Sequence, residues 1–206
     1  MKSAEGLVIL GFGGHARSVA AVALASGTTS LLFVDENAKE GEAFLGFPAI
    51  RRLDGAIDSG WSCMPAAGDN LLRQKQVAFA EANGWPLATV VANDATIHFD
   101  AVLGPGCFVG HHAHVGPSAQ VAKGCIINTG AIVEHESVVG EFSHVSVNAV
   151  VAGRSRLGSL VFLGAGATVI DSVSIAGHIT IGAGATVVEA LVVPGTYAGC
   201  PARRIS

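Results

Sequence analysis

The chain has 206 residues, a formal charge of −4 and a mean hydropathy of +0.52. This length predicts one or two domains, and the weak negative charge without a basic run argues against nucleic acid or an anionic membrane as partner. No apolar run approaches the roughly 18 to 20 residues needed to cross a bilayer, so no membrane span is expected. The N-terminus lacks the long apolar core and cleavage site of a signal peptide, which predicts a cytoplasmic protein.

The first ninety residues alternate apolar strands with helical stretches. A glycine turn at residues 11–15 leads into a helix over 16–26, and a second helix runs from Asn70 to Asn83 with Asp69 as its N-cap. The expected strands cover residues 7–10, 31–34, 47–50 and 62–67. This order predicts an α/β domain over residues 1–92, built as half of a Rossmann fold.

The glycine turn carries a nucleotide-binding pattern. Gly11, Gly13 and Ala16 satisfy G-x-G-x-x-A, and Asp35 follows about 20 residues on. The glycines let backbone amides approach a phosphate, and the following helix N-terminus favours its charge. Because a dinucleotide fold needs two such halves, the turn predicts the phosphate of a nucleotide or nucleotide sugar rather than NAD. A turn needed only for packing remains the alternative.

The rest of the chain is organised by a six-residue repeat. An aliphatic residue returns every sixth position in seventeen places, from Ile97 to Val193, and a small residue stands two positions before most of them. Such a short, fixed period predicts a parallel β-solenoid over residues 93–206. Three hexads form one coil, and at about 4.8 Å per coil the rod is about 27 Å tall.

The repeat leaves the hand of the coil open, although the general rule for crossover connections favours a right-handed one. The residues after Val193 leave the repeat and are expected to cap the last coil. Cys107 and Cys125 lie three hexads apart in the small-residue row, which places them next to each other in successive coils as reduced core thiols.

Glu134, His135 and Glu136 form the strongest candidate for chemistry. A carboxylate beside an imidazole orients its tautomer and supports its charged form, as a general base requires. The two glutamates point apart in an extended backbone, so at most one is expected to serve. Gly153 lies one full coil after His135 and therefore directly above it, where an accessible amide suits an oxyanion donor. His144 is half a coil away and could meet His135 only across a trimer interface.

A cluster of histidines raises a metal alternative. His111, His112 and His114 are residue types that bind zinc. Successive residues of a strand diverge, and no two of these are one coil apart, so the expected ligand geometry is poor. The sequence predicts no metal site.

The chain resembles the nucleotide-sugar acetyltransferases of bacterial glycan biosynthesis, in the sialic acid O-acetyltransferase and bacillosamine N-acetyltransferase family. The similar segments cover nearly the whole chain and are Gly11–His15, Gly68–Asn70 with Arg73, Asn128–Glu136, Phe142–Ser146 and Gly199–Ala202. The resemblance implies a left-handed β-helix and a homotrimer with its active sites between subunits. It also implies acetyl-CoA as cosubstrate, bound between neighbouring rods.

The resemblance further implies roles for single residues. His135 is the general base, Glu136 orients it, and Gly153 offers its amide to the thioester oxygen. Acetyl-CoA is held along His144, Gly153, Ala165 and Ala183. The nucleotide-sugar subsite comprises Gly13, Gly14, His15, Asp35, Gly68, Asn70, Arg73 and Asn128.

These inferences predict direct N-acetylation of a 4-amino-deoxysugar linked to UDP or GDP, without a covalent enzyme intermediate. A sugar hydroxyl acceptor is the first alternative. A β-helix zinc hydratase similar to the γ-class carbonic anhydrases and a non-catalytic nucleotide-binding scaffold are the others.

Overall fold

The computed structural model describes residues 5–206, so residues 1–4, at the start of the first expected domain, lie outside the description. The chain divides into two compact units between Asn93 and Asp94. The sequence predicts this division one residue earlier, after residue 92. Within the described chain, no helix combines the length and the apolar character needed to cross a bilayer.

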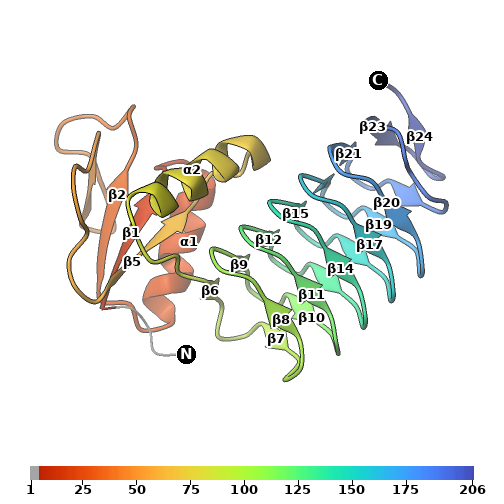
Figure 1. Cartoon of the computed structure of the whole chain (residues 1–206), viewed down its shortest axis with the longest axis horizontal. Helices are drawn as coiled ribbons and strands as arrows, with labels where there is room; N and C mark the ends of the chain where they lie inside the picture. The colour runs from red at the N-terminus through yellow and green to blue at the C-terminus, as the bar shows by residue number, and fades with distance from the viewer. Residues whose placement is uncertain (1–4) are drawn as a thin grey trace. The chain divides into compact units, whose positions relative to one another are not determined.

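The first unit is built on a five-stranded sheet in the order β3-β4-β2-β1-β5 (Figure 1). Four strands are parallel, and the short β3 pairs antiparallel with β4 at one edge. The central strand β1 is buried along its whole length, which explains its continuous apolar sequence. The four expected strands are all present, whereas the two-residue strands β3 and β6 were not predicted. The strands of this unit are β1 (Gly6–Leu10), β2 (Ser30–Val34), β3 (Ala43–Phe44), β4 (Phe47–Ile50), β5 (Trp61–Pro65) and β6 (Val90–Val91).

Two helices follow β1 and β5. Helix α1 (Gly14–Ala25) begins directly at the glycine turn, two residues earlier than expected, and helix α2 is Asn70–Ala82. The Asp69 side chain accepts a hydrogen bond of 2.7 Å from the amide of Leu72, so the predicted N-cap is confirmed. Because β2 and β5 flank β1 on opposite sides, the chain reverses direction across the sheet at β1. The turns after β1 and β5 therefore adjoin at the switch point where α/β folds bind ligands.

The second unit is a parallel β-helix with three faces (Figure 1). Partners on each face are three hexads apart, as in the pairing of His114 with Ile132 and of Ile132 with Val150, which confirms the predicted coil length. One face consists of β7 (Thr96–Ile97), β10 (His114–Val115), β13 (Ile132–Val133), β16 (Val150–Val151), β19 (Thr168–Val169) and β22 (Thr186–Val187). The second consists of β8 (Val102–Leu103), β11 (Gln120–Val121), β14 (Val138–Val139), β17 (Arg156–Leu157) and β20 (Ser174–Ile175). The third includes β9 (Phe108–Val109), β12 (Ile126–Ile127), β15 (His144–Val145), β18 (Phe162–Leu163), β21 (Ile179–Ile181), β23 (Gly195–Ala198) and β24 (Arg203–Arg204).

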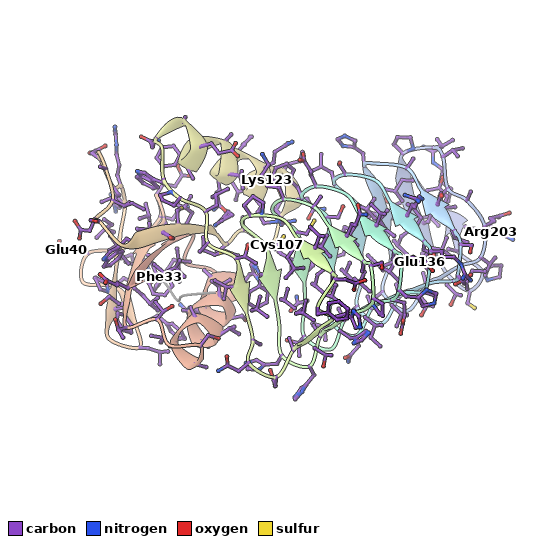
Figure 2. All side chains as sticks on the ribbon, turned by 60° about the horizontal axis from the view of Figure 1, so that its bottom comes forward. Phe33, Glu40, Cys107, Lys123, Glu136 and Arg203 are labelled. Carbon is purple, nitrogen blue, oxygen red and sulfur yellow. The ribbon has the colours of Figure 1, made fainter. Side chains whose placement is uncertain are left out.

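The inside of the coils holds the aliphatic and small-residue rows. Cys107, labelled in Figure 2, and Cys125 are buried reduced thiols, as predicted. Their sulfur atoms donate to the carbonyls of Ala122 and Gly140, respectively. The buried Ser137 makes the equivalent bond to Ala152 at 2.9 Å. A hydroxyl is thus accommodated in the core because each one reaches a main-chain carbonyl of the next coil.

The repeat shortens in the last coil, so the predicted unbroken six-residue register is wrong there. Ile175 pairs with Leu191 rather than with Val193, and Ile179 pairs with Gly195 at the same reduced spacing. Leu191 is therefore buried, whereas Val193, the expected last inward residue, is 48% exposed. The turn after β22 is shorter than its predecessors, so an unbroken six-residue count selects the wrong residue.

Candidate active site

His135 lies in the turn between β13 and β14, on an outer corner of the β-helix. Its Nδ1 atom is 3.1 Å from Oε2 of Glu136, which is labelled in Figure 2. Both side chains are partly exposed. Glu136 has a φ of +59°, so this segment is a turn rather than the extended backbone assumed from the sequence. Glu134 instead accepts a bond of 3.3 Å from the His135 amide. Glu136 is therefore the glutamate that contacts the imidazole.

Gly153 stands over the His135 ring, as the coil length predicts. A Cβ atom on Gly153 would lie 2.5 Å from both Cε1 and Nε2 of His135, closer than any side chain tolerates. The Gly153 carbonyl accepts from the amide of Ser172 at 2.9 Å, while its own amide has no hydrogen-bond partner among residues 5–206. The imidazole edge and a free backbone donor therefore lie next to each other.

Asp171 and Arg154 belong to the same corner and were missed by the sequence analysis. Asp171 lies one coil beyond Gly153, and its Oδ2 atom is 2.8 Å from Nη2 of Arg154. This bond, helped by one from the hydroxyl of Ser172, lowers the pKa of Asp171, so the side chain stays ionised. The signal was present in the sequence, because Asp171 follows Gly153 by the same coil length that separates Gly153 from His135.

His144 lies on β15, a different face from the one that ends at His135. Its side chain is 8% exposed and packs edge-on against Phe162, with ring centroids 5.1 Å apart. Its Nε2 atom is 3.2 Å from Nδ2 of Asn128, so the structure brings together two residues that the resemblance implicated. His135 lies at the corner between the two other faces, so the two histidines stay apart, as their half-coil spacing predicts.

Ala165 and Ala183 are exposed in equivalent turns, after β18 and β21. Each is followed by a glycine in the left-handed region, and a Cβ atom on Gly166 or Gly184 would meet nothing within 4 Å. This corner of the β-helix is consequently smooth and open over at least two coils, which suits contact with an extended ligand.

The glycine turn of the α/β unit depends on the backbone of Gly11 and on a hydrogen bond to Asp35. Gly11 has a φ of +113°, which requires glycine, and Cβ atoms on Gly13 or Gly14 would meet open space. Packing therefore does not explain the last two glycines. Asp35 accepts a bond of 2.9 Å from the amide of Phe12, so this carboxylate shapes the turn and leaves the amides of the following residues in place for a ligand.

The loop after β5 lies against the glycine turn. A Cβ atom on Gly68 would be 4.0 Å from that of His15, and Asn70 accepts a bond of 2.8 Å from Nη2 of Arg73. Arg73, expected to contact the substrate, is fully buried, and its Nη1 atom donates to the carbonyl of Ala67 at 2.9 Å. Its guanidinium therefore helps to shape this segment, and its contact with the substrate stays a prediction.

Gln76, on α2, is another structural residue near the glycine turn that was not predicted from the sequence. Its oxygen accepts from the amide of Ala67 at 3.0 Å, and its nitrogen donates to the carbonyl of Leu10 at 2.9 Å. One side chain therefore ties the ends of β1 and β5 together. No sequence signal identifies it, because a glutamine on a helix is usually a surface residue.

The histidines considered for zinc do not converge. His111 and His112 each contact Asp94, at 2.8 Å and 3.3 Å, and their ring centroids are 6.4 Å apart. Desolvation raises the pKa of Asp94, but the hydrogen bond from His111 and the other nearby contacts outweigh it, so the pKa lies below its usual value. Within residues 5–206, no three histidine, cysteine or acidic side chains are grouped to hold a metal ion.

Comparison with known proteins supports the resemblance. The family model described as the PglD N-terminal domain matches residues 6–78. The acetyltransferase domain of PglB from Neisseria gonorrhoeae FA1090 is 30% identical, with a TM-score of 0.91 over 98% of this chain and 100% of that one. Its complex with acetyl coenzyme A gives the same score over 99% of that chain. Comparison with curated protein sequences gave no match.

A second solved structure is similar over the same length. A histidine-to-alanine mutant of GDP-perosamine N-acetyltransferase from Caulobacter crescentus, in complex with CoA and GDP-perosamine, is 31% identical, with a TM-score of 0.87. The match covers 98% of this chain and 97% of that one. The chain is accordingly a half-Rossmann α/β unit followed by a left-handed parallel β-helix, an exception to the right-handed crossover rule.

Proposed function

Because the chain belongs to the hexapeptide-repeat family of bacillosamine and perosamine N-acetyltransferases, we propose that it transfers an acetyl group from acetyl-CoA to the amine of a nucleotide-linked amino sugar. The acceptor is a 4-amino-deoxysugar carried by UDP or GDP, in bacterial glycan biosynthesis. The observation that carries the proposal is the His135–Glu136 pair beneath the free amide of Gly153.

The proposed reaction is direct transfer. The neutral imidazole of His135 donates its Nδ1 hydrogen to Glu136 and accepts the amine proton at Nε2. The amine nitrogen attacks the thioester carbon, and the Gly153 amide donates to the oxygen on which negative charge develops. The carbon–sulfur bond then breaks, and the proton held by His135 passes to the departing CoA thiolate. The products are an amide and free CoA.

The proposed cosubstrate site lies along the open corner of the β-helix at Ala165 and Ala183. It includes His144, on β15 of the preceding coil. His144 lies on one face and His135 at the corner between the other two, so a single copy does not present both to one thioester. We therefore propose a homotrimer in which His135 of one rod and His144 of a neighbour line the same site. The PglB domain bound to acetyl coenzyme A supports this choice of cosubstrate.

The proposed nucleotide site lies at the switch point of the α/β unit. Gly13 and Gly14 present exposed backbone at the N-terminus of α1, where a phosphate is favoured. His15, Gly68 and Asn70 adjoin this turn, while Asp35 supports it through the amide of Phe12. Asn128, on the β-helix, is the remaining residue proposed for the acceptor. The complex of the Caulobacter enzyme with GDP-perosamine supports a nucleotide sugar.

The test uses mass spectrometry on the full chain with acetyl-CoA and a panel of UDP- and GDP-linked 4-amino sugars. His135→Asn removes the base while nearly keeping the side-chain shape, and we expect its kcat to fall by about 10²- to 10⁴-fold. His178→Asn is the matched control, because His178 is an exposed corner histidine of the same β-helix with a φ of +61°. Near wild-type kcat for His135→Asn would rule out the proposed base.

A further inference from the structure

The two oxygens of Asp171 have different surroundings. Oδ2 accepts two hydrogen bonds of 2.8 Å, from Nη2 of Arg154 and from the hydroxyl of Ser172. Oδ1 accepts none from the described part of the chain. The carboxylate is thus fixed through one oxygen, and the other remains available to a ligand.

The open oxygen faces the proposed base. The Cβ position of Gly153 is 2.9 Å from Oδ1 of Asp171 and 2.5 Å from Nε2 of His135. Since both atoms lie so close to one point, they cannot be farther apart than the sum of those distances. A side chain at position 153 would fill the space between them. Because glycine has no side chain, Nε2 of His135 and Oδ1 of Asp171 both point toward the open space beside Gly153 as hydrogen-bond acceptors.

An amine and a hydroxyl use two acceptors differently. A neutral primary amine has two hydrogens and one lone pair, so it can donate to both acceptors while its lone pair points at the thioester carbon. A hydroxyl has one hydrogen, which the base takes. Its second lone pair would then face the carboxylate, and the two would repel each other.

We propose that Asp171 is a substrate-binding residue that selects a primary amine over a hydroxyl as the acetyl acceptor. This inference rests on the function proposed above and narrows its substrate class. Oδ1 of Asp171 accepts one N–H of the amine, and His135 accepts the other. During transfer the amine nitrogen loses only the proton that faces His135, and His135 accepts it. The hydrogen facing Asp171 stays as the N–H of the amide product, so Asp171 neither gains nor loses a proton.

Arg154 gives the corner its charge balance. It lies one coil above Glu136 and interacts electrostatically with that side chain as well as with Asp171. The bond to Asp171 raises the pKa of Arg154, as it lowers that of Asp171. The hydrogen bond from the Arg154 guanidinium holds the pKa of Asp171 below its usual range, so Asp171 is ionised and accepts hydrogen bonds rather than donating them.

The test compares a nucleotide-linked 4-amino sugar with the matched 4-hydroxy sugar, as acceptors and as competitive inhibitors. For Asp171→Asn we expect kcat/KM with the amine to fall about 10- to 100-fold, because one N–H loses its charged acceptor. The inhibition constant of the 4-hydroxy sugar should stay the same or decrease, which means equal or tighter binding. The KM for acetyl-CoA should not change. Asp100→Asn is the control, since Asp100 is a carboxylate bonded to Ser118 in an equivalent corner and should leave this selectivity unchanged.

The outcomes separate the two proposals. Wild-type protein that acetylates no amino sugar overturns the proposed function itself, before any variant is made. An active wild type whose Asp171→Asn variant keeps its preference for the amine overturns only the role of Asp171. Equal losses with both acceptors also overturn that role, because they would mean that Asp171 merely adjusts the basicity of His135.

Discussion

In the α/β unit, the polar side chains around the glycine turn bind the main chain. Arg73 and Gln76 are fixed by carbonyl and amide groups of the neighbouring loops, and Arg73 is fully buried. At the corner of the β-helix, His135 and Asp171 instead bind other side chains, and each keeps one polar atom without a partner in the described chain. The first group determines the shape of a binding loop, whereas the second group supplies reactive atoms. Substitutions in the two regions should therefore have different consequences.

The largest expected effect is on activity, at the corner of the β-helix that holds His135. In Gly153→Ala the new methyl group would displace the His135 ring, since it would lie 2.5 Å from Nε2. We expect kcat/KM to fall by at least about 100-fold, as for loss of a general base. Because position 153 belongs to the corner rather than to the aliphatic core, the thermal unfolding temperature measured by circular dichroism should change little. A variant that unfolds much earlier, or that stays active, would contradict this distinction.

The next effect is on stability, in the α/β unit. Arg73→Met removes the buried guanidinium that donates to the carbonyl oxygens of Ala67, Gly68 and Asp69. We expect the free energy of unfolding to fall by about 2–3 kcal/mol. Urea unfolding followed by tryptophan fluorescence measures this unit selectively, because both tryptophans, Trp61 and Trp85, belong to it. Unchanged stability with a raised KM for the nucleotide sugar would instead support the direct substrate contact predicted for Arg73.

The same contrast explains how far the sequence could be interpreted. In the β-helix, neighbours are found by adding one coil length, so the position of Gly153 over His135 followed from counting, and Asp171 could have been found in the same way. In the α/β unit, the contacts of Arg73 and Gln76 depend on loop geometry that no period encodes. The choice between Glu134 and Glu136 depended on a single left-handed residue in a turn, which an assumption of extended backbone conceals.

The smallest effects should come from the last coil, where paired residues are closer in sequence than the three hexads of the earlier coils. Leu191 occupies the inward position that the repeat assigns to Val193. Leu191→Ala should lower the free energy of unfolding by about 2 kcal/mol, at the lower end for a buried leucine because a terminal coil can partly collapse around the cavity. Val193→Ala, at an exposed site, should change it by less than about 0.5 kcal/mol. Urea unfolding followed by circular dichroism compares the two, and the reverse order would mean that the six-residue repeat continues unbroken to Val193.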